Sequence, residues 1–275
     1  MTLDVRRDTD GTARARLDAR LARPRAQGLD VITTLEHFAI VSYLVPVDRL
    51  RPHVDPQFEV VPFRERGETC GLVSVVPFVV VDFRFARLPF LRFRFAQTNY
   101  RLYVTDRRGD HLAWFFGTSL DTVWVAVPHH VWKLPWYRAR TRFDASYAHA
   151  DGRYARYRFA TRSRWAPAEA SLVDRGTPMP LLPGFADMDA QRLVLTNPVR
   201  GVFLRRDGRV GTYSIWHPEM QLTSGDVEHA RFGLLERLGL LDGAQMKRAH
   251  SVLFTPRIEF QIRLPPTEYA ARGDG

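Results

Sequence analysis

The 275 residues are 45% hydrophobic and 25% charged, which excludes a disordered chain and allows one large domain or two small ones. The formal charge of +10 suggests a nucleic-acid binder. However, all basic residues except two lysines are arginines, and they are spread along the chain without a clustered patch or recognition motif. We therefore expect no specific nucleic-acid partner. One cysteine, Cys70, excludes an intramolecular disulfide, and the arginine-rich first 27 residues exclude a signal peptide there, so we expect a cytoplasmic protein with no membrane partner.

Three regions are expected from the distribution of apolar residues. Residues 1–30 have few apolar anchors and predict a mobile tail, or a short frayed helix around 13–22. Residues 31–265 contain no repeat or low-complexity linker and predict a single domain. Residues 266–275 predict a frayed C-terminal tail.

Strand patterns dominate the central region. Alternating or continuous apolar runs bounded by turn residues predict strands at 38–45, 59–64, 71–85, 92–105, 111–117, 138–147, 154–164, 199–205, 210–216 and 251–264. A helical turn is expected at 46–52, a helix at 120–132 that Pro128 kinks or ends, and a helix at 227–241 capped by Thr223 or Ser224. The fold class is therefore α+β, with a largely antiparallel, β-barrel-like sheet and a few helices.

Arginines alternate with aromatic residues between Phe83 and Phe95. This segment has two interpretations: a cationic surface loop for membranes or single strands, or two strands with phenylalanines inward and arginines outward, joined near Pro89. The period of two favours the strands.

Several motifs in order resemble one family. They are Val45–Pro52, Asn99–Val104 followed by Trp114–Asp121, Leu134–Ala139, and Ser214–Leu222 before Leu238-Gly-Leu. Together, over about residues 38–264, they resemble the uncharacterised YqjF-like family of bacterial proteins, which is similar in fold to acetoacetate decarboxylase. The resemblance implies a sheet around a buried pocket for a small organic acid or carbonyl compound, with no cofactor.

The chemistry of the decarboxylases is not carried by the resemblance. Their Tyr-Pro-Lys-Lys motif aligns with Leu134-Pro-Trp-Tyr137, so Trp136 and Tyr137 replace the Schiff-base lysine and the lysine beside it. The decarboxylases also carry an acidic residue that follows an Asn on a barrel strand, and the corresponding position in this chain is Tyr100 or Arg101. Neither Trp nor Tyr can form an iminium, so a Schiff-base decarboxylation is not expected. Trp136 remains a candidate substrate contact.

Candidate site residues each have a functional and a structural interpretation. Arg101, next to Asn99 on a strand, is expected to hold a substrate carboxylate or to pair with Asp121. Lys133 would need to turn inward to act, and an exposed lysine is favoured. His217 is a candidate general base, although a hydrogen-bonded core histidine is favoured.

No metal or nucleotide site is expected. His129, His130 and His217 lack partners at metal-ligand spacing, and no glycine-rich nucleotide motif or nucleophile elbow occurs.

Three functions stay open from the sequence. The first is a small-molecule pocket protein with lyase- or isomerase-type activity, in which Arg101 anchors an acid and Tyr137, His217 or Lys133 moves protons. The second is a non-catalytic binding protein that keeps the fold. The third is a basic nucleic-acid or membrane-surface binder. A homo-oligomer is also left open.

Overall fold

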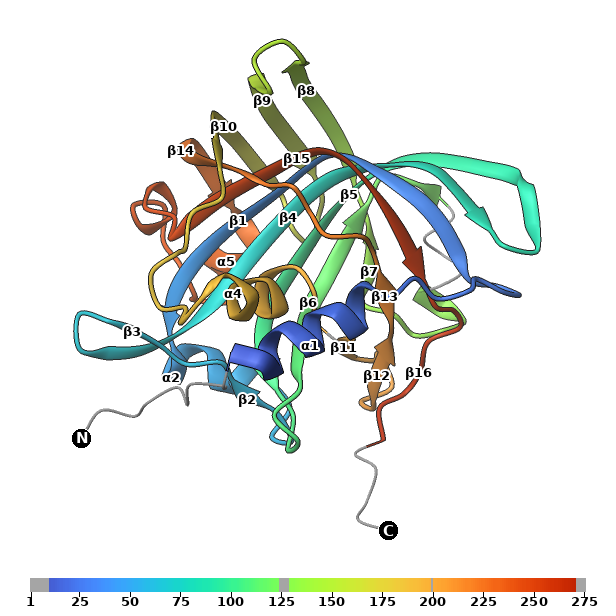
Figure 1. Ribbon diagram of the computed structural model, residues 1–275, viewed down its shortest axis with the longest axis horizontal. Helices are drawn as coiled ribbons and strands as arrows, with labels where there is room; N and C mark the ends of the chain where they lie inside the picture. Colours follow the sequence, from blue (N-terminus) through green and yellow to red (C-terminus); the bar gives the residue numbers. More distant parts are fainter. Residues whose placement is uncertain (1–9, 124–128, 199, 271–275) are drawn as a thin grey trace.

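A computed structural model describes residues 10–123, 129–198 and 200–270 (Figure 1). Most of the described chain belongs to one large, strongly curved sheet. Its strands are β1 (Val31–Pro46), β2 (Glu59–Val60), β3 (Phe63–Glu65), β4 (Glu68–Phe85), β5 (Leu88–Thr105), β6 (His111–Leu120), β7 (Trp136–Arg138), β8 (Arg140–Ala148), β9 (Arg153–Arg162), β10 (Ala168–Pro178), β11 (Gly201–Leu204), β12 (Val210–Tyr213), β13 (Ile215–Trp216), β14 (Thr223–Phe232), β15 (Ser251–Ile262) and β16 (Thr267–Glu268).

The sheet is mixed and open. The main strand order is β16-β12-β11-β6-β5-β4-β1-β15-β14-β10-β9-β8, and most neighbours are antiparallel. Strand β6 is the exception, because it pairs in parallel with both β11 and β7. Among the described strands, the end strands β16 and β8 do not pair with each other, so the sheet curls without closing into a barrel. The expected α+β class with a decarboxylase-like sheet is confirmed, but closure into a barrel is not found.

The long central strands are buried on both faces. In β4, Val73 and Val75 point into one apolar core, whereas Leu72 and Val76 point into another on the opposite face. A strand covered on both faces is continuously apolar rather than alternating, which is why the run in β4 has so few polar interruptions. The second core, which includes Phe38 from β1, contributes the apolar walls of the cavity described below.

The helices are short and lie around the sheet. They are α1 (Asp10–Leu21), α2 (Val47–Leu50), α4 (Met188–Leu195) and α5 (Gly233–Arg237), with 3-10 turns at Arg51–His53 and Gln245–Lys247. None of the described helices is long and apolar enough to cross a membrane. The helix predicted at 227–241 is wrong: the chain stays extended to Phe232, because β14 pairs with β10 as far as that residue, and only residues 233–237 are helical. The helix predicted at 120–132 includes residues 124–128, which lie outside the described residues.

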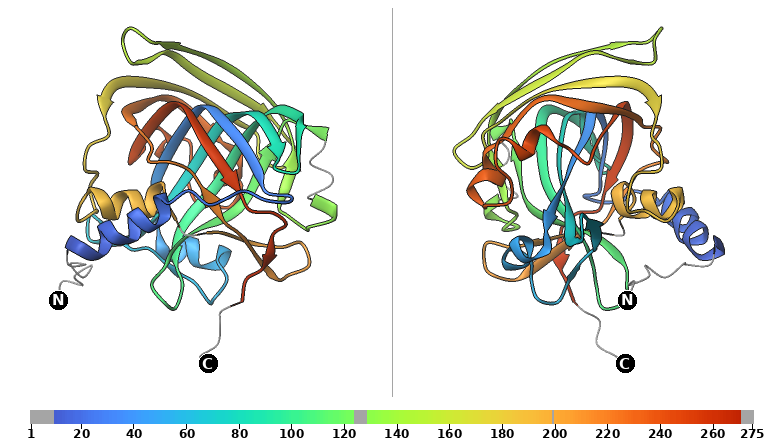
Figure 2. Two further views of the ribbon diagram at one scale, coloured as in Figure 1. Left: turned by 45° about the vertical axis from the view of Figure 1, so that its right-hand side comes forward. Right: turned by 90° about the vertical axis from the view of Figure 1, so that its left-hand side faces the viewer.

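Residues 10–30 are more firmly attached than the sequence suggested. Helix α1 packs against α4, with Ala13 and Leu17 buried against Leu193 (Figure 2). The indole Nε1 of Trp216 donates to the carbonyl oxygen of Leu21 at 3.0 Å. The expected lack of apolar anchors in this segment is therefore wrong from residue 13 onward. At the other end, Thr267–Glu268 pairs with β12 as β16 instead of fraying.

Candidate functional site

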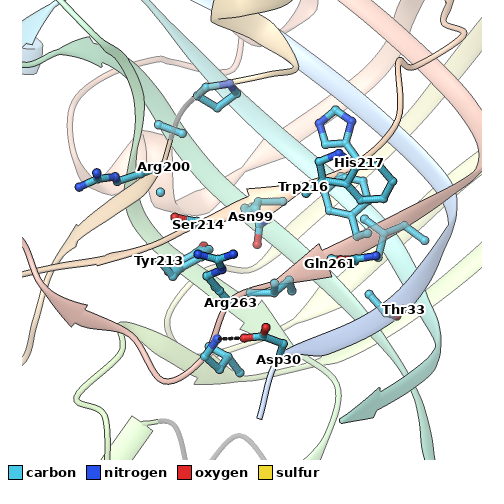
Figure 3. A pocket seen from close by; sticks show the side chains of 18 of the residues that line it. Asp30, Thr33, Asn99, Arg200, Tyr213, Ser214, Trp216, His217, Gln261 and Arg263 are labelled. Carbon is cyan, nitrogen blue, oxygen red and sulfur yellow. Dashed lines mark hydrogen bonds between the residues drawn. The ribbon is translucent and has the colours of Figure 1, made fainter. Parts of the chain in front are cut away.

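A cavity of about 290 Å³ lies beneath the N-terminal segment, against the inner face of the curved sheet (Figure 3). Its walls come from four parts of the chain: the segment from Arg20 to Phe38, the facing side chains of β4 and β5, residues of β6 and β7 together with Leu134, and the stretch from Thr196 to Met220 with the end of β15. Five arginines line this cavity together with a single acidic residue, Asp30. The cavity is therefore suited to an anion.

Aromatic side chains are a large part of the apolar wall. They include Phe38, Phe78, Phe95, Phe115, Phe260 and Trp136. Apolar lining with a few directed polar groups is the usual make-up of a small-molecule site. The wall would cover the hydrocarbon part of a ligand, while the polar groups would orient its charged part.

Strand β5 supplies the polar groups at the base of the cavity. Gln97, Asn99 and Arg101 line it together, because alternate residues of a strand share a face. The Asn99 Oδ1 accepts hydrogen bonds from Gln97 Nε2 at 2.8 Å and from Thr118 Oγ1 at 3.0 Å. These two donors fix the amide, and its Nδ2 has no acceptor among the described residues, so it can donate to a ligand.

Thr118 faces the same side of the sheet as Asn99 because the two residues pair directly across β5 and β6. A β-bulge follows them: the pairing of β5 with β6 shifts after Tyr100, which leaves Phe116 as an extra residue in β6. One extra residue reverses the alternation of the strand beyond it, and such bulges are common beside functional sites. Phe115 rather than Phe116 therefore pairs with Arg101 and lines the cavity.

Arg101 is a buried cation without a counter-ion. Arg101 is only 8% exposed, and no carboxylate of the described chain lies within 4 Å of its guanidinium. One guanidinium nitrogen donates to the carbonyl oxygen of Leu195 at 2.9 Å, the group lies 5.3 Å from the centre of the Tyr103 ring, and the Nε has no hydrogen-bond partner in the described structure. The structural alternative, a pair with Asp121, does not form, because the Asp121 carboxylate accepts the backbone N–H of Thr141 at 3.1 Å.

His217 lines the cavity, but its ring nitrogens are already engaged. Nδ1 lies 2.7 Å from the carbonyl oxygen of Pro218, and Nε2 lies 2.8 Å from that of Thr196. The ring stacks on Phe260 at 4.7 Å. Burial lowers the pKa of His217, and nearby Arg101 lowers it further, while the two carbonyl oxygens oppose this shift. With neither nitrogen free to accept a proton from a ligand, the geometry favours the core histidine over the general base.

Two of the predicted catalytic residues do not line the cavity. Lys133 is half-buried at a left-handed backbone position (φ 56°), and its carbonyl oxygen accepts the N–H of Arg206 at 3.1 Å. Tyr137 stacks on Trp165 with ring centres 4.2 Å apart. Its neighbour Trp136 does line the cavity, as the sequence suggested for a substrate contact. Neither lysine of the chain is among the described lining residues, so the structure offers no amine nucleophile there.

Tyr213 and Arg263 also line the cavity, and the sequence did not single them out. Burial raises the pKa of Tyr213, an effect that Arg101 partly offsets, so the phenol stays protonated and can donate a hydrogen bond. Both residues line the cavity together with Asn99, although they lie more than 100 residues further along the chain, at the end of β12 and just after β15 (Figure 3). No local pattern could have joined them to Asn99. The only available signal was that both lie on predicted strands, 210–216 and 251–264.

The fold is that of acetoacetate decarboxylase-like proteins. Acetoacetate decarboxylase from Legionella pneumophila is 13% identical, with 92% of this chain and 95% of that one covered and a TM-score of 0.57. The enduracididine biosynthesis enzyme MppR, complexed with the condensation product of pyruvate and imidazole 4-carboxaldehyde, is 12% identical, with coverages of 89% and 90% and a TM-score of 0.58. An acetoacetate decarboxylase-like enzyme from Sphingomonas wittichii RW1 is 9% identical, with coverages of 88% and 94% and a TM-score of 0.53.

Within this fold the chain belongs to DUF2071, a family of uncharacterized conserved proteins, whose pattern matches residues 33–259. The expected membership of an uncharacterised family with a decarboxylase-like fold is thereby confirmed. No curated protein matches the chain. At these identities the solved structures establish the fold alone.

Proposed function

We propose that this protein binds a small organic acid, with the carboxylate of the ligand on Arg101 and its hydrocarbon part against the aromatic wall. The observation that carries the proposal is the buried, unpaired guanidinium of Arg101. Leaving a cation buried without a partner costs several kcal/mol, and a ligand carboxylate offsets that cost. Guanidinium and carboxylate groups match in a two-bond geometry, which also fixes the orientation of the ligand.

The remaining polar groups suit a second oxygen on the same ligand. The Nδ2 of Asn99 and the hydroxyl of Tyr213 are both donors on the cavity wall. A carbonyl or hydroxyl oxygen close to the carboxylate would accept from them. Keto and hydroxy acids with an apolar substituent therefore fit better than simple fatty acids of the same size. That MppR has been obtained in complex with pyruvate, a keto acid, agrees with this choice.

The test compares a carboxylate with its neutral amide. We expect 3-phenylpropionate and phenylpyruvate to bind in calorimetric titrations, and 3-phenylpropanamide to bind at least about tenfold more weakly. Arg101→Met should weaken the binding of the acids by a similar factor. It should not lower the stability of the ligand-free protein, because the substitution removes an unpaired buried charge. Arg140→Gln, at an exposed arginine of β8, is the matched control and should change neither property. Equal affinity for acid and amide, or unchanged binding by Arg101→Met, would refute the proposal.

A second candidate function is a lyase- or isomerase-type reaction of a keto acid through its enol. The observation that favours it is the protonated Tyr213 hydroxyl in the same cavity as Arg101. Both Tyr213 and Asn99 could donate to a developing enolate oxygen, while a solvent water takes the proton from the carbon beside the carbonyl and returns a solvent proton to it. The test is the exchange of the C–H beside the carbonyl for deuterium in bound phenylpyruvate, followed by NMR. Exchange that is accelerated by the protein and lost in Tyr213→Phe supports catalysis. Binding without acceleration supports the non-catalytic protein.

A further inference from the structure

A second, more open chamber of about 520 Å³ continues outward from the mouth of the cavity. The two share six lining residues, Asp30, Arg200, Tyr213, Ser214, Arg263 and Leu264. The outer chamber has a different character, because its own residues include Gln27, Thr212 and Thr267 and no aromatic side chain except the shared Tyr213. The site therefore has an aromatic inner part and a polar outer part.

The junction between the two chambers carries unpaired positive charge. Arg200 and Arg263 are both exposed, and neither forms an ion pair with the described part of the chain. In Figure 3 the Arg263 side chain lies between Tyr213, Ser214 and Asp30. Some exposed arginines elsewhere are paired, as Arg175 is with Asp226 at 2.6 Å, and others, such as Arg140, have no ion pair in the described structure. What distinguishes Arg200 and Arg263 is that both line both chambers.

The one carboxylate at the junction is already used for backbone hydrogen bonds. Asp30 accepts the N–H of Gln27 at 3.0 Å through Oδ2. It also accepts the N–H of Leu264 at 3.3 Å through Oδ1 (Figure 3). Its role is to tie the N-terminal segment to the end of β15, and no salt bridge to Arg263 forms within 4 Å. The junction keeps a net positive charge.

We propose that the outer chamber binds a second anionic group of the same ligand, with Arg263 as its main contact and Arg200 and Ser214 beside it. This inference rests on the proposed function, since the first anionic group is the carboxylate on Arg101. The two chambers meet at their six shared residues, and the ligand that we infer extends from Arg101 along the aromatic wall to Arg263. The ligand is then an elongated dianion with an apolar middle, whose outer group is a carboxylate or a phosphate.

The experiment compares acids that differ only at the outer end. Linear monocarboxylates are titrated against α,ω-dicarboxylates and ω-phosphonocarboxylates of the same chain length, over a series of lengths. At the length that spans both arginines, we expect the dianions to bind at least about tenfold more tightly than the monoanion. The phosphonate and dicarboxylate arms show which outer group is preferred.

Two variants separate this inference from the proposed function. Arg263→Gln should remove the advantage of the dianion and leave the affinity for the monocarboxylate within about twofold, whereas Arg101→Met should weaken both. Arg140→Gln again serves as the control. If the dianions bind no more tightly than the monocarboxylates, or if they still bind more tightly in Arg263→Gln, this inference is overturned and the proposed function is not. Failure of every acid to bind the native protein would overturn the proposed function as well.

Discussion

Leu17 provides a direct test of whether the N-terminal helix is part of the folded body. Its side chain is completely buried, and it packs with Ala13 and Leu21 of its own helix and with Leu193 of α4. Buried Leu→Ala substitutions cost about 2–5 kcal/mol. Because α1 lies at the outside of the molecule and can shift to reduce the cavity, we expect Leu17→Ala to cost about 2–3 kcal/mol, near the low end of that range.

The assay is urea unfolding followed by tryptophan fluorescence, with thermal melting as a second measurement. A loss of this size corresponds to a Tm lower by roughly 5 °C in a chain of this length. Leu29→Ala is the matched control, since it makes the same change at a leucine that is 45% exposed. If both variants unfold at the same urea concentration, then α1 does not contribute to the stability of the body, and the reasoning fails.

Three other predictions concern different parts of the molecule. Lys133 lies outside the cavity, so borohydride reduction with pyruvate or acetoacetate should leave no adduct in the mass spectrum; a stoichiometric adduct that Lys133→Ala abolishes would contradict this. Gly225→Ala should unfold at a much lower temperature than Gly243→Ala. A Cβ at residue 225 would lie 2.1 Å from a backbone oxygen of β10, whereas a Cβ at residue 243 would meet no atom within 4 Å. Equal melting temperatures would contradict this close approach of β14 to β10. Burial lowers the pKa of His250 from its ordinary 6.5, so the unfolded state is protonated first as the pH falls. The stability that neutral His250 contributes is therefore present above about pH 6.5 and is lost as the pH falls toward the folded-state pKa. The unfolding free energy of the native protein should fall between about pH 7.5 and 5.5, and His250→Gln should make this fall smaller. His149→Gln, at an exposed site, should leave it unchanged.

The strands that the sequence predicted are those whose own apolar pattern is strong. β10 was missed although its pattern is regular: Ala168, Ala170 and Leu172 are buried, while Glu169 and Val173 are exposed. Alanine contributes too little apolar surface for this alternation to stand out. The wrong helix at 227–241 had the opposite cause: a sequence compatible with a helix is held extended as far as Phe232 by its pairing with β10, and tertiary pairing outweighs local preference.

Helix α4 could have been found from its first residue. Asp187 accepts the N–H of Ala190 at 2.7 Å, which is the usual N-cap arrangement, and the residues that follow have a helical apolar pattern. Within the site, Asn99 and Arg101 could be predicted because one strand places them on the same face. Arg263 could not, because its nearness to them depends on the order in which distant strands pair.

The charge of the chain is better understood from the cavity than from the composition. A formal charge of +10 in the whole sequence is compatible with any polyanionic partner. Locally the balance differs from place to place: arginines such as Arg175 and Arg257 are paired with carboxylates, whereas five arginines around the cavity share only Asp30, which is engaged by backbone N–H groups. An inner chamber of about 290 Å³ admits a small molecule but not a folded polymer. The buried Arg101 and the arginines gathered around the cavity, rather than the arginines dispersed over the surface, are therefore the basis on which we propose a small organic anion as the partner.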